Sequence, residues 1–324
     1  MVKNLSIIFQ KIKNRFQYYS YLYKTREKHL SLGNENPNIT FYIIKIDFRM
    51  AGLFAIVKSI LSHIQYAIDK EYIPIIDMKN SQNCFNEELS ENPWEFFFKQ
   101  PTHYTLEDVK KSKNIIVSCN RQVPQLQYAI GVSLLQNNNQ YKLDNWAKIY
   151  KEHIKINDNT KKYLSTTYNS IIENRKNILG VLCRGTDYLD KQPAGHPIQP
   201  TPETVIKKIL SLKETLNFEW IYLATEDIRI LDLFKKQFGN QLLYINQLRF
   251  GQIECEYLCD YNYKENSKIK MNLDYLSSLY ILSKCDFLIG GRTAGTIGAY
   301  LMSANKFKYT FFWDLGTYPH KNIK

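Results

Sequence analysis

The stretch ILGVLCRGTDYLDKQPAGHPIQP, residues 178–200, decides the fold of this chain. It begins with the apolar run 178–182, which is typical of a strand that is buried on both faces in a parallel sheet. Loops at the carboxyl ends of parallel strands line the ligand crevice of open α/β sheets. The polar segment after the run is therefore predicted to face a ligand, and it consists of Arg184, Gly185, Thr186 and Asp187.

Arg184 has two interpretations. A guanidinium at a strand end offers a permanently charged fork that matches two phosphate oxygens. Gly185 would let the backbone turn closely, while Thr186 and Asp187 could hold the arginine or a sugar hydroxyl. Alternatively, Arg184 and Asp187 only pair with each other, which is the more common role for an isolated R-G-T-D segment. The rest of the chain decides between the two.

Strands and helices are predicted to alternate on both sides of this stretch. In the first half, strands are expected at 39–46, 73–77 and 115–118, and helices at 53–69 and within 143–174. In the second half, strands are expected at 178–182, 220–224, 242–245, 286–289 and 309–313, with helices at 200–216, 228–238, 272–284 and up to 303. This order predicts an α/β fold of two Rossmann-like domains, residues 1–174 and 175–324.

Three loops of the second half leave the carboxyl ends of strands and can converge on one crevice. They are R-G-T-D from 184, T-E-D from 225 and G-G-R-T-A-G-T from 290. The third loop is rich in glycine and opens a helix, so its N–H groups and the helix dipole suit a phosphate. It lacks the spacing and the lysine of a P-loop. Alone it would indicate a tight turn, but together with Arg184 it favours a cradle for a diphosphate.

The segment G-V-L-C-R-G-T-D-Y, residues 180–188, resembles the arginine-bearing peptide of the fucosyltransferase superfamily. This superfamily includes α1,6-fucosyltransferases, protein O-fucosyltransferases and bacterial chitooligosaccharide fucosyltransferases, and its pattern is roughly G-V-H-V-R-R-T-D. The H-P-I of residues 196–198 is similar to the tripeptide that follows in the α1,6 enzymes. Three positions depart from the pattern. The family's histidine is Leu182, its second arginine is Gly185, and the acidic residue before H-P-I is Gln192.

Two later segments strengthen the resemblance. A-T-E-D at 224–227 is similar to the A-T-D-D of α1,6-fucosyltransferases, and residues 283–299 resemble their S-x-C-x-x-x-x-G-x-x-S-S motif. The resemblance implies a GT-B fold and an inverting hexosyltransferase that takes a sugar, first of all fucose, from a GDP-sugar. It also implies that no metal cofactor is needed, because the arginine takes the place of the divalent ion.

The resemblance assigns the site residues as well. Arg184 would hold the β-phosphate, and Asp187, Asp190 and His196 are the candidates for orienting it or for the general base. The first loop, residues 47–54, resembles the first loop of fucosyltransferases, which faces acceptor and donor, so Arg49 and Gly52 are placed on the acceptor side. An ordinary turn is an equal alternative for Arg49. The donor would contact Arg184, Gly185, Thr186, Thr225, Glu226, Asp227, Gly291, Arg292, Thr293 and Ala294.

The charge of the chain is concentrated at its beginning. The formal net charge is +12, which usually indicates an anionic partner. Residues 1–30 hold seven basic residues against Glu27, namely Lys3, Lys11, Lys13, Arg15, Lys24, Arg26 and Lys28. Residues 5–23 place Leu5, Ile8, Ile12, Phe16, Tyr19 and Tyr23 at helical spacing. Such a basic amphipathic helix either lies in an anionic membrane surface or packs on the protein.

The remaining features bear on location. No apolar run is long enough to span a membrane, no signal peptide is recognisable, and the six scattered cysteines suit reduced, buried thiols. We therefore expect a cytoplasmic bacterial enzyme, either free or peripheral on the inner face of the cytoplasmic membrane. It would build a capsule or lipopolysaccharide glycan on a glycan or lipid-linked acceptor. The alternatives are a GDP-heptose or other donor, a sugar-nucleotide binding module without turnover, and a nucleic-acid-binding protein, which the clustered charge argues against.

Overall fold

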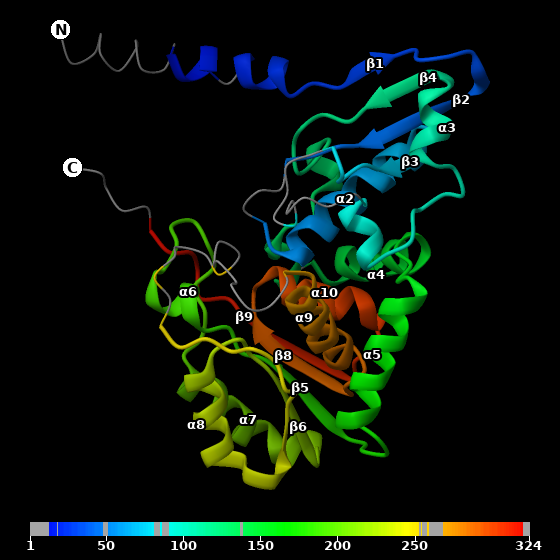
Figure 1. The fold of residues 1–324 in the computed structure, drawn as a ribbon. Coiled ribbons are helices and arrows are strands. Elements are labelled where there is room, and N and C mark those ends of the chain that lie inside the picture. The colour runs from blue at the N-terminus through cyan, green and yellow to red at the C-terminus, as the bar shows by residue number, and fades with distance from the viewer. Residues whose placement is uncertain are drawn as a thin grey trace, which may run out of the picture.

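Two open sheets form the frame of the molecule and lie one above the other in Figure 1. This computed structural model describes residues 13–17, 19–47, 51–80, 85, 91–136, 139–252, 254, 258 and 268–319. The upper sheet has the strand order β1-β4-β2-β3, and the lower sheet has the order β7-β6-β5-β8-β9. Their strands pair in parallel throughout, except that β1 is antiparallel to β4. The two predicted Rossmann-like halves are thus confirmed.

The upper lobe follows the predicted order with one added strand. Its elements are β1 (Lys28–Leu30), β2 (Glu35–Ile44), α2 (Leu53–Asp69), β3 (Ile73–Ile76), α3 (Leu106–Lys110) and β4 (Ser112–Val117). The strand expected at 39–46 begins earlier, at Glu35, and its register with β4 shifts between Glu35 and Thr40. The aromatic segment around Trp94, Phe97 and Phe98 is buried, as expected for core. Short 3-10 helices lie at Pro93–Phe96, Leu126–Tyr128 and Val132–Leu135.

The lower lobe contains the stretch that decides the fold. Its strands are β5 (Ile178–Leu182), β6 (Trp220–Ala224), β7 (Leu242–Leu243), β8 (Phe287–Gly291) and β9 (Tyr309–Trp313). Its helices are α6 (Thr186–Asp190), α7 (Pro202–Leu216), α8 (Ile228–Phe238), α9 (Lys268–Leu282) and α10 (Ala294–Ser303), with a 3-10 turn at Gly239–Gln241. The chain moves from β5 to β7 on one side and continues with β8 on the other. The switch point, where ligands bind in such sheets, therefore lies between β5 and β8.

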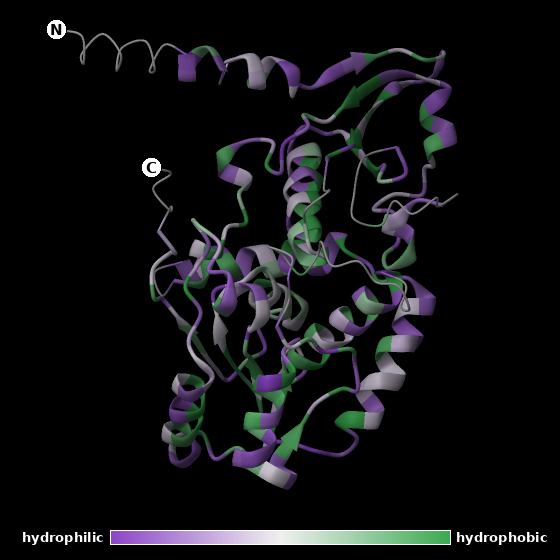
Figure 2. Cartoon of the chain, turned by 60° about the vertical axis from the view of Figure 1, so that its left-hand side comes forward, coloured by the Kyte–Doolittle hydropathy of each residue, from purple (hydrophilic) through white to green (hydrophobic). Residues whose placement is uncertain are grey.

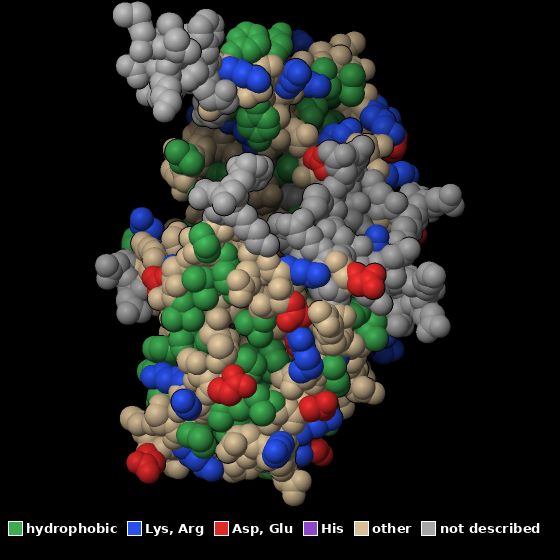
Figure 3. Space-filling view, turned by 90° about the vertical axis from the view of Figure 1, so that its left-hand side faces the viewer, with side chains coloured by type: hydrophobic (Ala, Val, Ile, Leu, Met, Phe, Trp, Pro, Cys, Tyr) green, Lys and Arg blue, Asp and Glu red, His purple; other side chains and the backbone are tan. Residues whose placement is uncertain are grey.

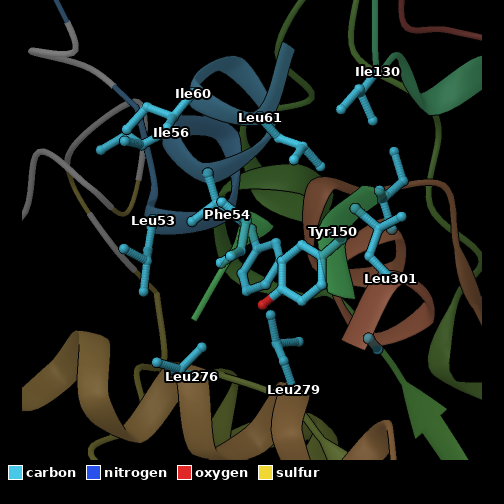
Figure 4. Close-up of a cluster of buried hydrophobic side chains, with 14 of the residues drawn as sticks. Leu53, Phe54, Ile56, Ile60, Leu61, Ile130, Tyr150, Leu276, Leu279 and Leu301 are labelled. Atoms are coloured by element: carbon cyan, nitrogen blue, oxygen red, sulfur yellow. The ribbon is translucent and has the colours of Figure 1, made fainter. Parts of the chain in front are cut away.

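One hydrophobic core joins the two lobes. Between the sheets run α4 (Gln140–His153), which packs against α10, and α5 (Asp158–Ile171), which packs against α9. Figure 4 shows Phe54 of α2 and Tyr150 of α4 meeting Leu279 of α9 between the lobes. A side chain at Gly298 would collide with the ring of Phe54, so α10 and α2 are in close contact. In Figure 2, hydrophobic residues gather on α2 and on strands inside the molecule.

The first described residues form a helix that leads away from the upper sheet (Figure 1). Residues 13–17 and 19–24 are helical, whereas Leu5, Ile8 and Ile12 of the predicted stripe lie outside the described residues. The described members of the stripe, Phe16, Tyr19 and Tyr23, are exposed to 75%, 55% and 67%. They do not pack on the rest of the protein as core residues would. No described helix is both long and apolar enough to cross a bilayer.

The cysteines agree with the expectation of reduced thiols as far as they are described. Cys119, Cys183 and Cys285 are buried and free. The other three, Cys84, Cys255 and Cys259, lie outside the described residues.

Candidate active site

The loop after β5 is held in a strained conformation. Thr186 has a φ of 41°, which is unusual for a β-branched residue and costs free energy unless its surroundings enforce it. Its N–H donates to Asp227 Oδ2 at 2.9 Å, and the N–H of Gly185 donates to Glu226 Oε1 at 2.9 Å. The β6 loop thus fixes the turn that starts α6. This one-turn helix was not predicted, because contacts from β6 rather than local sequence stabilise it.

Arg184 lies between two carboxylates at the end of β5. Its Nη2 donates to Asp187 Oδ1 at 3.0 Å, and its Nη1 is 3.6 Å from Glu226 Oε1. Its guanidinium also lies over the ring of Tyr188, 5.1 Å from the centroid. Burial opposes the charge of Arg184, but Glu226 and Asp187 outweigh it and raise the pKa of the guanidinium. Arg184 and Asp187 therefore do pair, but they do so within a larger cluster.

The hydrogen bonds leave part of the guanidinium available. Among the described residues, neither Nε nor Nη1 of Arg184 has a hydrogen-bond acceptor, since the contact with Glu226 is an ion pair at longer range. The side chain retains 21% exposure. A cation that is fixed on one side and open on the other suits the binding of an anion such as a phosphate.

Glu226 and Asp227, predicted to contact the donor, hold the protein's own backbone and arginines here. Asp227 is fully buried, caps α8 through the N–H of Arg229, and forms an ion pair with the Arg229 side chain. Burial opposes its ionisation, but the hydrogen bonds from Arg229 and Thr186 keep the pKa of Asp227 below its ordinary value. Thr225 is buried beside it and its Oγ1 accepts from the N–H of Asp227.

Gly185 stands where the family pattern has a second arginine, and the structure leaves no space for a side chain there. A Cβ on Gly185 would lie 2.5 Å from the Cβ of Asp227. This is closer than non-bonded carbon atoms approach in proteins. The buried carboxylate that holds Thr186 therefore excludes a second arginine from this turn.

The other two candidates for the base have different partners. Asp190 faces Arg229, whose Nη2 is 2.9 Å from its Oδ2, so this carboxylate belongs to the ion-pair cluster around Asp227. His196 lies 3.2 Å from the hydroxyl of Tyr188 through its Nδ1. The ring of Tyr188 thus connects Arg184 to His196.

The loop after β8 contributes the first turn of α10. The side chain of Thr293 caps this helix by accepting from the N–H of Thr296 at 3.1 Å. The N–H groups of Ala294 and Gly295 have no acceptor among the described residues, as is usual in a first turn. Arg292 is buried and paired with Asp314 at 2.6 Å, and Gly291 lies tightly against Gln199. The structure therefore brings an open helix N-terminus and Arg184 to the two sides of the switch point.

The acceptor-side residues are partly described. Arg49 lies outside the described residues. Gly52 is exposed at the start of α2, and a Cβ placed on it would meet no atom within 4 Å. Figure 3 shows that the molecule is hollowed between its two lobes on the side where α6 lies in Figure 1.

Two residues near the site escaped the sequence analysis. Arg249 follows β7, beside Phe250, which forms backbone bonds with Glu226 and Ile228. No carboxylate within the described ranges lies at ion-pair distance from Arg249, and burial lowers the pKa of its guanidinium. Tyr275 of α9 lies close enough to Arg184 and Glu226 for their charges to act on it. Neither residue belongs to a recognisable motif.

In the described part of the chain, no three His, Cys, Asp or Glu side chains form a metal-binding group.

Solved structures show which fold this is. The chain matches NodZ α-1,6-fucosyltransferase soaked with GDP-fucose at a TM-score of 0.50 and 14% identity, covering 87% of this chain and 97% of that chain. The chain has the GT-B fold. This confirms the predicted fold class and, at the level of fold, the resemblance to fucosyltransferases.

Two other matches fall just below that level of similarity, and the fold assignment does not rest on them. POFUT1 in complex with GDP-fucose has a TM-score of 0.49 and 9% identity, with 86% of this chain and 99% of that chain covered. Arabidopsis thaliana FUT1, as a mutant in complex with GDP, has a TM-score of 0.47 and 12% identity, with 94% and 75% covered. No protein-family model and no curated protein sequence matches the chain.

Proposed function

We propose that this GT-B protein is an inverting, metal-independent glycosyltransferase that moves fucose from GDP-fucose to a glycan acceptor. The position of Arg184 is the observation that supports this most. Its guanidinium is fixed by Asp187 and Glu226 at the switch point of the sheet, across from the first turn of α10. A sugar nucleotide carries a diphosphate, which fits a cation and open N–H groups. The similar fold of NodZ, soaked with GDP-fucose, agrees with this donor.

The geometry suits the charge that develops during transfer. When the bond from sugar C1 to the β-phosphate oxygen breaks, its electron pair stays on the phosphate. A guanidinium that is already in place stabilises this charge without reorganisation, and loss of one such donor typically costs about 3 kcal/mol. Asp187 and Glu226 supply the support for Arg184. We therefore assign Asp187 to orienting the arginine rather than to accepting a proton.

The general base is assigned to His196. The two carboxylates among the candidates each hold a guanidinium, Asp187 that of Arg184 and Asp190 that of Arg229. His196 instead contacts a neutral phenol, that of Tyr188. An imidazole can take the proton of an acceptor hydroxyl near neutral pH. His196→Gln should therefore slow transfer to the acceptor strongly while GDP binding stays unchanged, and equal transfer by the variant would contradict the assignment.

A nucleotide screen tests the function directly. We expect GDP to raise the melting temperature of the protein, and UDP, CDP and dTDP to do so much less, because a ligand at 100 times its Kd adds about 2.7 kcal/mol. Turnover of GDP-fucose, compared with GDP-heptose and GDP-mannose, then identifies the sugar. Binding of GDP without turnover of any donor would indicate a sugar-nucleotide binding module. A mobility shift with DNA or RNA at physiological salt, without a GDP response, would favour the nucleic-acid alternative.

The N-terminal helix suggests where the acceptor is met. We propose that it rests on the anionic inner face of the cytoplasmic membrane and that the acceptor is a lipid-linked surface glycan. The exposure of Phe16, Tyr19 and Tyr23 supports this position over one in the core. Arg15 lies over the ring of Tyr19, and Arg26 over that of Tyr23. Aromatic rings beside cations suit the boundary between lipid head groups and chains.

Vesicle sedimentation tests this part of the proposal. The protein should sediment with vesicles of phosphatidylserine and phosphatidylcholine, but not of phosphatidylcholine alone, and salt should weaken binding. Phe16→Ser combined with Tyr23→Ser should abolish sedimentation. Tyr141→Ser is the matched control, because Tyr141 is 84% exposed on α4. Equal binding by the double variant would contradict the proposal.

A further inference from the structure

A tyrosine hydroxyl lies at the switch point between the two phosphate-facing loops. Tyr275 belongs to α9, which packs along α10. A Cβ built on Gly295 would lie 2.8 Å from Tyr275 Oη and 3.1 Å from Leu182 Cδ1. Leu182 ends β5, and Gly295 is in the first turn of α10. The hydroxyl therefore lies where the end of β5 meets the start of α10.

This hydroxyl faces charge but has no hydrogen-bond partner in the described part of the chain. Glu226 and Arg184 both act on Tyr275 electrostatically, and so does Tyr188. The Tyr275 ring packs partly buried on the core of the molecule. The Tyr275 oxygen is not among the described side-chain atoms that are both buried and unpaired, so it remains accessible to a ligand. An unpartnered hydroxyl between Arg184 and an open helix N-terminus is thus suited to bond to a ligand.

The lack of a side chain at Gly295 leaves space for the Tyr275 hydroxyl. Any larger residue at this position of α10 would press a Cβ against Tyr275 Oη and Leu182. Helix propensity alone would favour a residue such as alanine over glycine at this position. The absence of a side chain leaves the space between α9 and α10 to the hydroxyl.

We propose that Tyr275 is a further donor-site residue, whose hydroxyl donates a hydrogen bond to the β-phosphate oxygen that leaves the sugar. This rests on the proposed function. In the step, the bond from sugar C1 to that oxygen breaks with its electron pair on the phosphate, and C1 bonds to the acceptor oxygen. The acceptor's proton goes to His196, and Tyr275 keeps its own. Burial raises the pKa of Tyr275, so the phenol stays protonated and acts as a donor, not as a base.

The bond should strengthen as charge develops, so it should affect kcat more than binding. Tyr275→Phe retains the ring and removes only the hydroxyl. We expect kcat for hydrolysis of GDP-fucose without acceptor to fall about 10- to 100-fold, the usual effect of a hydrogen bond to a charged group, with KM within about twofold. Tyr280→Phe is the control on the same helix, since its ring packs on Tyr168 away from the site, and should leave kcat unchanged.

A double-mutant cycle separates a direct role from a structural one. Gly295→Ala should lower kcat by displacing the hydroxyl, but should add little once Tyr275→Phe has opened the space. Unchanged kcat in Tyr275→Phe, or a change in KM alone, would overturn the proposal, as would fully additive losses. If the proposed function itself is wrong, the wild-type protein gives a different result from the one above. In that case the wild-type protein itself neither binds GDP by calorimetry nor hydrolyses GDP-fucose, and the role of Tyr275 falls with it.

Discussion

The two lobes open with the same strand–loop–helix order, but their first loops differ in character. In the upper lobe, Gly52 ends the loop after β2, is exposed, and has open space around a Cβ built on it. In the lower lobe, Gly185 lies against the buried carboxylate of Asp227. The next residue, Thr186, is held at a φ of 41°. The residue before α2 is exposed with space around it, whereas the turn before α6 is packed against a buried carboxylate.

This difference shows that a shared architecture does not distribute the chemistry evenly. The sheets supply similar edges, and at the lower one Arg184 is held by two carboxylates, Asp187 of α6 and Glu226 of the loop after β6. Such pre-organisation is what stabilises developing charge. Under the proposed function, the lower lobe would carry the donor chemistry and the segment at Gly52 would lie on the acceptor side. If this division of labour is right, changes in the lower loop should affect activity much more than matched changes in the upper one.

The largest effect should come from Arg184. Arg184→Lys retains a charge but loses the planar fork that contacts Asp187 and leaves Nε and Nη1 for a ligand. We expect kcat/KM for GDP-fucose to fall at least 100-fold, measured by release of GDP, with the melting temperature changed by only a few degrees. Wild-type turnover in this variant would show that the loop after β5 does not hold a phosphate.

Alanine substitutions at Gly185 and at Gly52 test the contrast between the two loops most directly. In Gly185→Ala, the new methyl group meets Asp227 at 2.5 Å, and such overpacking typically costs 1–3 kcal/mol. The melting temperature and the stabilisation by GDP should both fall. In Gly52→Ala, the methyl group meets nothing within 4 Å and the backbone φ of −66° is allowed, so stability should stay within about 0.5 kcal/mol. Equal losses in the two variants would refute the contrast.

Lowering the pH should reduce stability first through a group in the upper lobe. His63 is fully buried, its Nε2 donates to the carbonyl of Arg121, and its Nδ1 accepts from the Tyr42 hydroxyl. Burial lowers the pKa of His63 from 6.5 to about 4, so below pH 6.5 the unfolded state takes up the proton more readily. Stability should be complete above pH 6.5 and fall by up to about 3 kcal/mol as the pH approaches 4.

Urea unfolding of wild-type protein and His63→Gln at several pH values measures this loss, which the variant should lack. In the lower lobe, the pKa of Asp227 lies below its ordinary 3.8, so its contribution is lost only at more acid pH. Parallel pH curves for wild type and variant would show that His63 is not the group responsible.

The smallest effect is expected from chelation. If Arg184 and the first turn of α10 carry the phosphate charge, as proposed, EDTA should leave donor turnover unchanged. Metal ions from the preparation should first be measured by mass spectrometry. Loss of activity with EDTA that Mg²⁺ or Mn²⁺ restores would mean that the cluster around Arg184 is not sufficient.

Most of the frame could be predicted because hydrophobic periodicity is local. The helix expected at 53–69 has those bounds in the structure, and the lower strands were located within two residues. The strand β1 was missed since Lys28–Leu30 is exposed and pairs only at an edge. The short helix α6 was missed because carboxylates from β6 hold it.

The candidate site was predictable only where residues belong to a motif. Arg184, Asp187 and Glu226 lie in motifs at strand ends, and the structure brings them together. Their partnership could not be foreseen, because it depends on the pairing of β5 with β6. Tyr275 follows the apolar pattern of a core helix, and Arg249 lies in a polar loop, so neither carries a local signal.

The packing of Phe54 against Gly298 has a consequence for how such proteins diversify. Because α2 and α10 belong to one continuous core, a recombination event that exchanged only one lobe would separate two surfaces that fit each other without spare volume. Sequence variation is therefore expected to accumulate in exposed segments, such as the one at Gly52, rather than at this contact. The same contact makes it unfavourable to exchange one lobe between related proteins as a separate module.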